Sequence, residues 1–234
     1  MLDSNFWNSY FRTYDALNLI EPYRNLLQSI YHKIGTAEGM KVLDAGSGSG
    51  NLAVLLKNNG ALVTGLDWSK EGLDLMALKL PAIRIIQHDL NKSLPFSDND
   101  FDAIVSNNTI YAIKPENRPG VFREFYRTLK PGGKLVVSNV HQNFKPWSIY
   151  WAHIKFELKR SGLIKTAAVV CTFIVPTVKM FWYNYLIRKE NSNSSFAFLN
   201  AGEQQKLMKN AGFSFVSDDQ LVYAGQAYLT YAIK

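Results

Sequence analysis

The feature that most constrains the fold is VLDAGSGSG at residues 42–50, an apolar run that ends in a carboxylate and enters three glycines spaced by two. The run predicts a buried strand, and the next residues, NLAVLLKNNG, have the apolar spacing of a helix. Glycine lacks a Cβ, so it can adopt positive φ and lets a ligand lie against the backbone. The free N–H groups at the start of the helix suit a carboxylate or a phosphate. We therefore favour a binding loop; the alternative is a tight turn that needs glycine only for its geometry.

Strand and helix patterns alternate between residues 40 and 140. Ser69 is predicted to cap one helix, and Pro131 with Gly132 is predicted to end another. This alternation predicts a parallel sheet with right-handed crossovers and helices on both faces. Residues 212–234 contain two β-rich runs with no helix between them, which predicts a hairpin with Ala224 and Gly225 near its turn. The predicted strands are KVLDAG, ALVTGLD, IRIIQHD, FDAIVSNN and KLVVSNV, followed by this hairpin.

The glycine spacing argues against a dinucleotide-binding loop. That loop has the pattern G-x-G-x-x-G, and counting from Gly46 the third glycine is replaced by Asn51. The observed pattern is D-x-G-x-G-x-G. Asp67 follows at the end of the second predicted strand, where a carboxylate can accept hydrogen bonds from both hydroxyls of a ribose. The alternative is that Asp67 only caps the helix that follows.

Four segments in order carry a resemblance to a known family: VLDAGSGSGNLA, GLDWS, QHDLNKSLPFSDNDFDAIVSNNTIYAI and REFYRTLKPGGKLVVSNV. They resemble the signatures of class I S-adenosylmethionine-dependent methyltransferases, in particular the small-molecule group that includes ubiquinone and menaquinone methyltransferases. The resemblance covers residues 40–140, and the segment EQQKLMKNAGF with the terminal hairpin agrees with it. It implies an α/β fold with a Rossmann-like, mostly parallel seven-stranded sheet whose last strand is antiparallel. It also implies S-adenosyl-L-methionine as the cofactor.

The resemblance assigns a role to individual residues. Gly46, Gly48 and Gly50 would approach the cofactor, and Asp44 would lie near its amino group. Asp67 would hold the ribose. The other implied contacts are Trp68 over the adenine, Asp89 at the adenine N6, Leu90 on the ring, the backbone around Asn107 along the methionine part, and Tyr14 closing over the cofactor. No metal is expected, and the single cysteine, Cys171, excludes a disulfide framework.

Two residues are candidates for catalysis. Methyl transfer is an in-line displacement at a sulfonium, and a general base is needed only if the nucleophile arrives protonated. His141 follows the fifth predicted strand and Tyr111 follows the fourth, so both are placed to act on an acceptor. The alternatives are a solvated loop histidine and a tyrosine that fills the core.

We predict one methyltransferase domain over residues 1–234. Residues 1–38 form an N-terminal helical lid, residues 39–140 the S-adenosylmethionine-binding core, residues 141–200 a helical cap inserted for the substrate, and residues 201–234 the terminal helix and hairpin. The segment ENSNSS at residues 190–195 is interpreted as a short polar linker. The N-terminal sequence lacks a signal-peptide pattern, which favours a cytoplasmic protein.

Most of the positive charge belongs to the predicted insertion. The chain carries a formal net charge of +7, and residues 151–190 contain seven basic and two acidic residues. Within them, TAAVVCTFIVPTV has only 13 residues between two lysines, fewer than the roughly 20 that span a bilayer. We expect a cap over an apolar pocket; contact of residues 151–190 with a membrane surface and a homodimer contact are the alternatives.

The expected function is transfer of a methyl group from S-adenosylmethionine to oxygen, nitrogen or carbon of a small acceptor, apolar or anionic. Nucleic acid is not the expected acceptor, because SNNTIY lacks the prolines of base amino-methyltransferases. The alternatives are a non-catalytic S-adenosylmethionine-binding partner protein, an enzyme that uses the cofactor's charge for a rearrangement, and a methyltransferase acting on a lipid or RNA.

Overall fold

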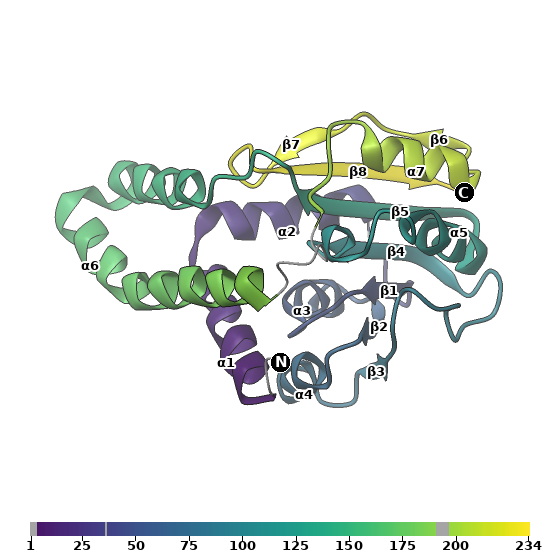
Figure 1. Cartoon of the computed structure of the whole chain (residues 1–234), viewed down its shortest axis with the longest axis horizontal. Helices are drawn as coiled ribbons and strands as arrows, with labels where there is room; N and C mark the ends of the chain where they lie inside the picture. The colour runs from purple at the N-terminus through teal and green to yellow at the C-terminus, as the bar shows by residue number, and fades with distance from the viewer. Residues whose placement is uncertain (1–3, 36, 191–196) are drawn as a thin grey trace.

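A central sheet organises the chain in the computed structural model, which describes residues 4–35, 37–190 and 197–234 (Figure 1). In the described residues the sheet has the strand order β3-β2-β1-β4-β5-β8-β6, with β7 also paired to β8. Strands β1 to β5 are mutually parallel, and β8 runs antiparallel to β5. The strands are β1 (Lys41–Ala45), β2 (Leu62–Asp67), β3 (Arg84–Gln87), β4 (Phe101–Asn107), β5 (Leu129–Val140), β6 (Phe215–Val216), β7 (Gln220–Val222) and β8 (Ala227–Ile233).

The predicted mostly parallel sheet with an antiparallel last strand is confirmed. Strands β6 and β7 pair with successive stretches of β8, so they are two halves of one interrupted strand and the sheet has seven strand positions. The predicted hairpin is formed by β7 and β8. Its turn contains Tyr223, Ala224 and Gly225 with positive φ, which Ala224 and Tyr223 adopt rarely and Gly225 readily.

Helices cover both faces of the sheet, as the alternation predicted. One buried cluster joins the sheet to α2, α3 and α4, and the other joins it to α5 and α7. Neighbouring strand residues alternate between the two clusters: Val42 lies in the first and Leu43 in the second. The helices and 3₁₀ turns are α1 (Ser4–Tyr14), η1 (Asp15–Leu19), α2 (Glu21–Ile34), α3 (Asn51–Asn58), α4 (Lys70–Lys79), η2 (Ile110–Ala112), α5 (Arg118–Thr128), α6 (Pro146–Glu190) and α7 (Glu203–Ala211).

Helix α5 ends before the predicted position. Its last residue is Thr128, and Leu129 already pairs with Phe101 of β4, so Pro131 and Gly132 lie at the irregular start of β5. Ser69 caps α4 as predicted, since its Oγ accepts a hydrogen bond from the Gly72 N–H at 3.2 Å.

The insertion between β5 and α7 is the helix α6, which is broken at Gly162. Gly162 has φ 74° and ψ 176°, outside the helical region, so residues 146–161 and 163–190 form two helical segments. They pack against each other through Tyr150 and Phe173, whose rings stack at 6.2 Å. The two segments project from the sheet as a helical hairpin (Figure 1). The predicted linker at 190–195 lies outside the described residues from position 191 onward.

Helix α6 contains the apolar run of residues 166–178. The 13 residues between the two lysines belong to the second segment, and the range Pro146–Tyr183, which includes the break at Gly162, is long and apolar enough by length and composition to cross a membrane. The predicted apolar run ended at Lys165 and Lys179, whereas the helical segment that contains it continues beyond both lysines.

Candidate functional site

The glycine loop connects β1 to α3 at the carboxyl edge of the parallel strands, where ligands bind in open α/β sheets. Its start is fixed to the neighbouring strand, because the N–H groups of Gly46 and Ser47 both donate to the Leu66 carbonyl, at 2.7 and 3.1 Å. Gly46, with φ 83°, packs so closely that a Cβ would lie 2.2 Å from the Thr109 side chain. The loop therefore needs glycine there for both its conformation and its close approach to the residues after β4.

Asp67 lies at the end of β2 and supports the glycine loop. Its Oδ2 accepts from the Gly48 N–H at 2.8 Å, and its Oδ1 accepts from the Ser69 N–H at 2.9 Å. Burial raises the pKa of Asp67, and the hydrogen bonds from Ser69 and Gly48 oppose that rise. Each carboxylate oxygen has a further lone pair. The side chain can thus orient the loop and still accept a ribose hydroxyl.

Asp44, on β1, lies beside Asp67 and is 2 % exposed. Burial, and then the neighbouring carboxylate of Asp67, raise the pKa of Asp44 to about 7. Its Oδ2 is buried without a hydrogen-bond partner among the described residues, as are Ser47 Oγ and Asn107 Oδ1. Buried polar atoms are nearly always paired in folded proteins. Three such atoms at one edge of the sheet are the expected sign of a polar ligand.

The remaining predicted cofactor contacts follow β2, β3 and β4 at the same edge. Trp68 is 61 % exposed directly after Asp67, and Leu90 is buried. The Asp89 Oδ1 accepts from the backbone N–H of Asn91 at 2.9 Å and from its side-chain amide at 2.8 Å. Burial raises the pKa of Asp89, but the hydrogen bonds from Asn91 and the charges of Lys92 and His88 outweigh it, so the pKa is lowered. Asp89 is therefore ionised at neutral pH and can accept a hydrogen bond.

Helix α1 lies over the glycine loop. A Cβ on Gly48 would be 3.2 Å from the Phe11 ring, which places α1 directly on the loop. The following turn, η1, is attached through Asp15: Ser49 Oγ donates to its Oδ1 at 2.5 Å, and Lys79 Nζ of α4 donates to the same atom at 2.7 Å. We call the contacts among Asp15, Ser49 and Lys79 the Asp15 latch.

A group of tyrosines fills the space between α1, α2 and the terminal hairpin. The ring of Tyr14 lies 6.1 Å from Tyr10 and 5.9 Å from Tyr23, and Tyr23 lies 6.0 Å from Tyr223. Burial raises the pKa of Tyr14, while hydrogen bonds with Asn108 and Tyr23 oppose the rise. Sequence reasoning identified Tyr14 but missed Tyr10, Tyr23 and Tyr223. The four-residue spacing of Tyr10 and Tyr14 on one helix face was the available signal.

The two catalytic candidates occupy different surroundings. Tyr111 in η2 packs its ring 5.5 Å from Phe198, and burial, followed by the nearby Tyr14, raises the pKa of Tyr111. Both ring nitrogens of His141 contact the backbone: Nδ1 accepts from the Asn143 N–H at 3.1 Å, and Nε2 lies 2.9 Å from the Gly225 carbonyl, to which it donates. In this arrangement His141 joins the end of β5 to the hairpin turn and has no lone pair left for a substrate proton. The catalytic role of either residue stays a prediction.

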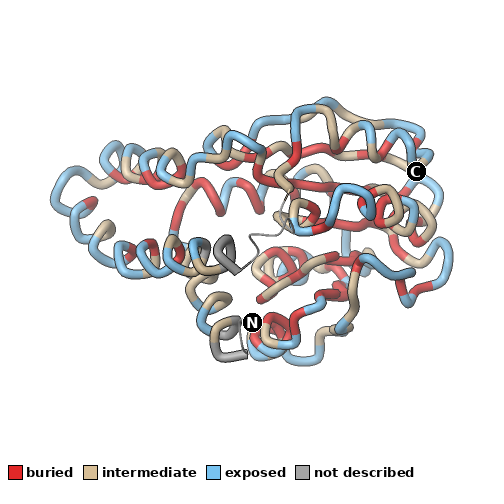
Figure 2. Tube along the Cα trace, viewed as in Figure 1, coloured by how far each residue is buried: buried red, intermediate tan, exposed pale blue. Residues whose placement is uncertain are grey.

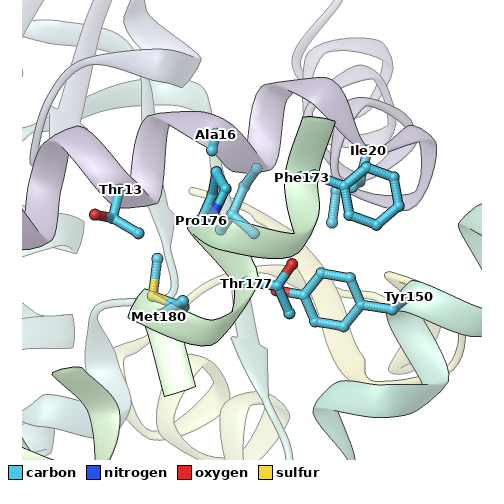
Figure 3. Close-up of a pocket in the computed structure, with 9 residues that line it drawn as sticks. Thr13, Ala16, Ile20, Tyr150, Phe173, Pro176, Thr177 and Met180 are labelled. Atoms are coloured by element: carbon cyan, nitrogen blue, oxygen red, sulfur yellow. The ribbon is translucent and has the colours of Figure 1, made fainter. Parts of the chain in front are cut away.

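The second predicted element of the lid, α6, packs on η1 and the end of α1. Tyr150, Phe173, Thr177 and Met180 of α6 face Thr13, Ala16 and Ile20 across a space of only about 10 Å³ (Figure 3). A space of this size holds one water molecule at most. Helix α1, η1 and α6 therefore form one packed layer, and a motion of α1 away from the glycine loop must involve α6.

Comparison with known proteins agrees with this site. Residues 43–137, which run from β1 into β5, match the family described as a methyltransferase domain. A demethylmenaquinone methyltransferase of Tropheryma whipplei is 27 % identical over 221 residues, covering 90 % of this chain and 87 % of that protein. These findings support a class I S-adenosylmethionine-dependent methyltransferase. S-adenosyl-L-methionine is accordingly its cofactor.

Other relatives of this methyltransferase extend the likeness. An uncharacterised methyltransferase of Synechocystis is 30 % identical over 109 residues, which are 47 % of this chain and about half, 51 %, of the relative's length. Among solved structures, the methyltransferase bound to the Trm112 activator in Haloferax volcanii has a TM-score of 0.67 at 16 % identity, over 100 % of this chain and 98 % of the other. An S-adenosylmethionine-dependent methyltransferase from Methanococcus maripaludis has a TM-score of 0.61 at 20 % identity, over 100 % and 94 % of the two chains. At these identities the structures establish the fold.

The cofactor's chemistry agrees with the residues at the site. An amino acid ammonium pairs with carboxylates, and the buried, unpartnered Asp44 Oδ2 supplies one. Asp67 offers lone pairs for ribose hydroxyls, and Asp89 offers an acceptor for an adenine amino group. Asp44, Asp67 and Asp89, with the glycine loop, are the residues that would hold it.

Proposed function

We propose that this methyltransferase acts on a small apolar acceptor that enters between α1, α6 and the carboxyl edge of the sheet. The observation that supports the proposal most directly is the cluster of tyrosines on α1, α2 and the terminal hairpin beside this region. The rings form a row of contacts in which Tyr10 contacts Tyr14, Tyr14 contacts Tyr23 and Tyr23 contacts Tyr223. Burial raises the pKa of each of these tyrosines. Uncharged rings suit an apolar molecule better than a hydrated one. The printed name of the Tropheryma whipplei relative, which specifies demethylmenaquinone, agrees with an acceptor of this kind.

The bound cofactor supplies an electrophilic methyl group on a sulfonium that leaves as a neutral thioether. The protein's contribution is to orient the acceptor and to exclude water, and orientation alone contributes several kcal/mol to such reactions. In this proposal, water is excluded by Phe11 of α1, which packs against the glycine loop, and by the packed layer of α1 and α6. Asp67 and Asp89 orient the ribose and the adenine.

Tyr111 acts as a neutral phenol in this proposal. Burial raises its pKa, so its hydroxyl is protonated at physiological pH and donates a hydrogen bond instead of removing a proton. The variant Tyr111→Phe should lower kcat by no more than about tenfold, the contribution of one hydrogen bond, and leave the pH–rate profile unchanged. Steady-state rates from pH 6 to pH 9 check this. A loss above about a thousandfold, together with the disappearance of one ionisation, would identify Tyr111 as a base.

The experiment that tests the proposed function follows the methyl group. The protein is incubated with methyl-tritiated S-adenosylmethionine and, separately, with the lipid extract and the aqueous metabolite extract of cells. We expect protein-dependent label in the organic-soluble products. Label confined to the aqueous fraction, or tight cofactor binding with no labelled product in either fraction, would contradict an apolar acceptor. The second result would favour a non-catalytic partner protein.

We place the protein in the cytoplasm, consistent with the reducing compartment expected for a single cysteine that is exposed in α6. We likewise propose that the one domain is divided into a lid, a cofactor-binding core, an insertion and a terminal unit.

A further inference from the structure

The second half of α6 has an exposed apolar face that the rest of the chain does not cover. Ile164 is 88 % exposed, Leu163 is 79 % exposed and Trp182 is 57 % exposed. The exposed apolar positions recur at intervals of three and four residues, which places them on one side of the helix. We call this set the outer face of α6: Leu163, Ile164, Ala167, Cys171, Ile174, Val175, Val178, Trp182 and Tyr185.

The outer face is separate from the side of α6 that packs on the protein. The buried positions of this segment, Thr166, Phe173, Thr177 and Met180, lie on a different side of the helix by their spacing. From residue 164 to residue 185 the outer face extends roughly 30 Å along the helix axis. The projecting end of α6 is largely exposed (Figure 2). A soluble monomer rarely exposes an apolar patch of this length, so it indicates a binding surface.

Basic side chains lie on both segments of α6, and Lys165 and Lys179 belong to the segment that carries the outer face. Lys155, Lys159, Arg160, Lys165 and Lys179 of α6 are all exposed. The single acidic residue between positions 146 and 189, Glu157, is buried and lies 3.5 Å from Arg160, so it leaves the lysines uncompensated. An apolar helix face bordered by lysines, with tryptophan and tyrosine at one end, is typical of helices that lie in the interface of an anionic membrane.

The same helix could instead cross a bilayer, since its length and composition suffice. Two contacts argue against that arrangement. The ring of Tyr183 packs edge-on against Phe6 of α1 at 5.3 Å, and Phe173 and Thr177 face η1 across the small space in Figure 3. A crossing helix would lose these contacts with the lid, whereas a helix lying in the interface keeps them and buries only its outer face.

We propose that the α6 hairpin docks on the surface of an anionic phospholipid bilayer, with the outer face of α6 in the boundary between headgroups and acyl chains. Lys155, Lys159, Lys165 and Lys179 pair with lipid phosphates. Docking brings the layer of α1 and α6 to the bilayer, so that an apolar acceptor enters the site from the lipid phase. This last consequence, the route of the acceptor, rests on the proposed function, but docking itself does not.

Co-sedimentation of the full chain with vesicles tests the proposal. One set contains phosphatidylcholine with 30 mol % phosphatidylglycerol, and the other contains phosphatidylcholine alone. We expect binding to the anionic vesicles, weaker binding at high salt, and a blue shift of tryptophan fluorescence from Trp182. Absence of binding to the anionic vesicles, or equal binding to both sets at all salt concentrations, would overturn the proposal. Protein that resists release at alkaline pH would indicate a crossing helix and overturn it too.

Variants identify the surface involved. Ile164→Glu with Val178→Glu should abolish binding, whereas Leu78→Glu on α4, also an exposed leucine, should leave it unchanged. Lys159→Gln with Lys165→Gln should weaken binding about 30-fold, and the matched pair Lys206→Gln and Lys209→Gln on α7 should have a much smaller effect. Calorimetric titration with S-adenosylmethionine shows that the variants are folded.

Two outcomes with the variants would contradict docking on lipid. One is vesicle binding that persists in Ile164→Glu with Val178→Glu. The other is a dimer of the wild type in light scattering that this variant converts to a monomer, because the outer face would then be an interface between two copies. Failure of vesicle binding leaves the tritium experiment unaffected, so the two proposals fail separately.

Discussion

At the scale of single residues, the site is characterised by carboxylates held in unequal environments. Asp44 is buried with one oxygen unpartnered among the described residues. Asp67 uses one oxygen to bind the glycine loop and the other to bind the start of α4, and Asp89 is partly exposed. Burial raises the pKa of the first two, whereas the hydrogen bonds of Asn91 lower that of Asp89. The protein without its cofactor therefore carries a cost at Asp44 that a bound cation would relieve.

That cost gives the first prediction. The folded protein keeps the Asp44 proton up to pH about 7, whereas an unfolded chain releases it near pH 3.8. The folded state therefore binds more protons between these values, and the free energy of unfolding falls as the pH rises through them, by an amount on the order of a few kcal/mol. Asp44→Asn has no such proton to lose, so the fall should be smaller in the variant.

Urea unfolding of both proteins at pH 4.5, 6 and 7.5, without cofactor, measures this difference. Asp67 contributes a fall of the same sign, but it is present in both proteins and largely cancels in the comparison. Parallel stability profiles of wild type and Asp44→Asn would show that burial does not raise the Asp44 pKa.

The structural roles of single residues could be predicted where a local sequence pattern indicates them. The glycines, Asp67 and the Ser69 cap each follow from a strand, a loop and a helix that are contiguous in the sequence. The Asp15 latch was not predictable, because Ser49 and Lys79 lie 34 and 64 positions after Asp15 in the sequence. None of the three residues is unusual in its own segment. The backbone contacts of His141 depend equally on a turn more than 80 residues away.

At the scale of elements, the predicted N-terminal lid contacts the core through polar side chains at η1. The Asp15 latch joins η1 to the glycine loop and to α4, while aromatic packing joins α1 to α6. Asp15 and Lys79 are about a quarter exposed, so water weakens their attraction only in part.

Removing the latch should loosen the lid. We expect Asp15→Ala to weaken S-adenosylmethionine binding about tenfold, because two hydrogen bonds to a charged group are lost. Hydrogen exchange in residues 4–14 should also become faster. Glu116→Ala, which removes an exposed acid before α5, is the control and should change neither quantity. Unchanged exchange in α1 of the Asp15 variant would contradict the role of the latch.

Gly162 gives a prediction about the hairpin. Its φ of 74° lies in the left-handed region, so Gly162→Ala should destabilise the folded protein by about 1 kcal/mol or more. Gly120 of α5 is the matched control: a Cβ there would lie 3.9 Å from Arg123 and meet no closer atom, so Gly120→Ala should stabilise by up to about 1 kcal/mol. Chemical unfolding measures both. Equal effects of the two substitutions would contradict a strained break at Gly162.

The helical break itself could not have been predicted. Gly162 lies between residues with helical preferences on both sides, and a single glycine is tolerated within a helix. The stacking of Tyr150 on Phe173, which holds the two segments together, joins parts of the chain that no local pattern relates. By contrast, the five parallel strands followed directly from the alternation of apolar runs and helical spacing.

At the scale of the whole molecule, the sheet brings the loops after β1, β2, β3 and β4 to one edge, and α1, η1 and α6 cover that edge. The order of strands follows from the sequence only through the family resemblance, because local patterns do not fix which strands are neighbours. The charged residues also differ between the core and the projecting α6 hairpin. The core carries the carboxylates that we propose bind the cofactor, and the projecting hairpin carries most of the excess basic residues.

The most direct test of this account is a calorimetric titration of the wild type and Asp67→Asn with S-adenosylmethionine and with its demethylated product. The account predicts that both compounds bind the wild type and that the variant binds them at least about tenfold more weakly, since Asp67 serves both the ribose and the glycine loop. Asp74→Asn on the exposed side of α4 should bind as the wild type does. Strong binding of a nicotinamide dinucleotide, with no heat from either sulfur compound, would contradict it.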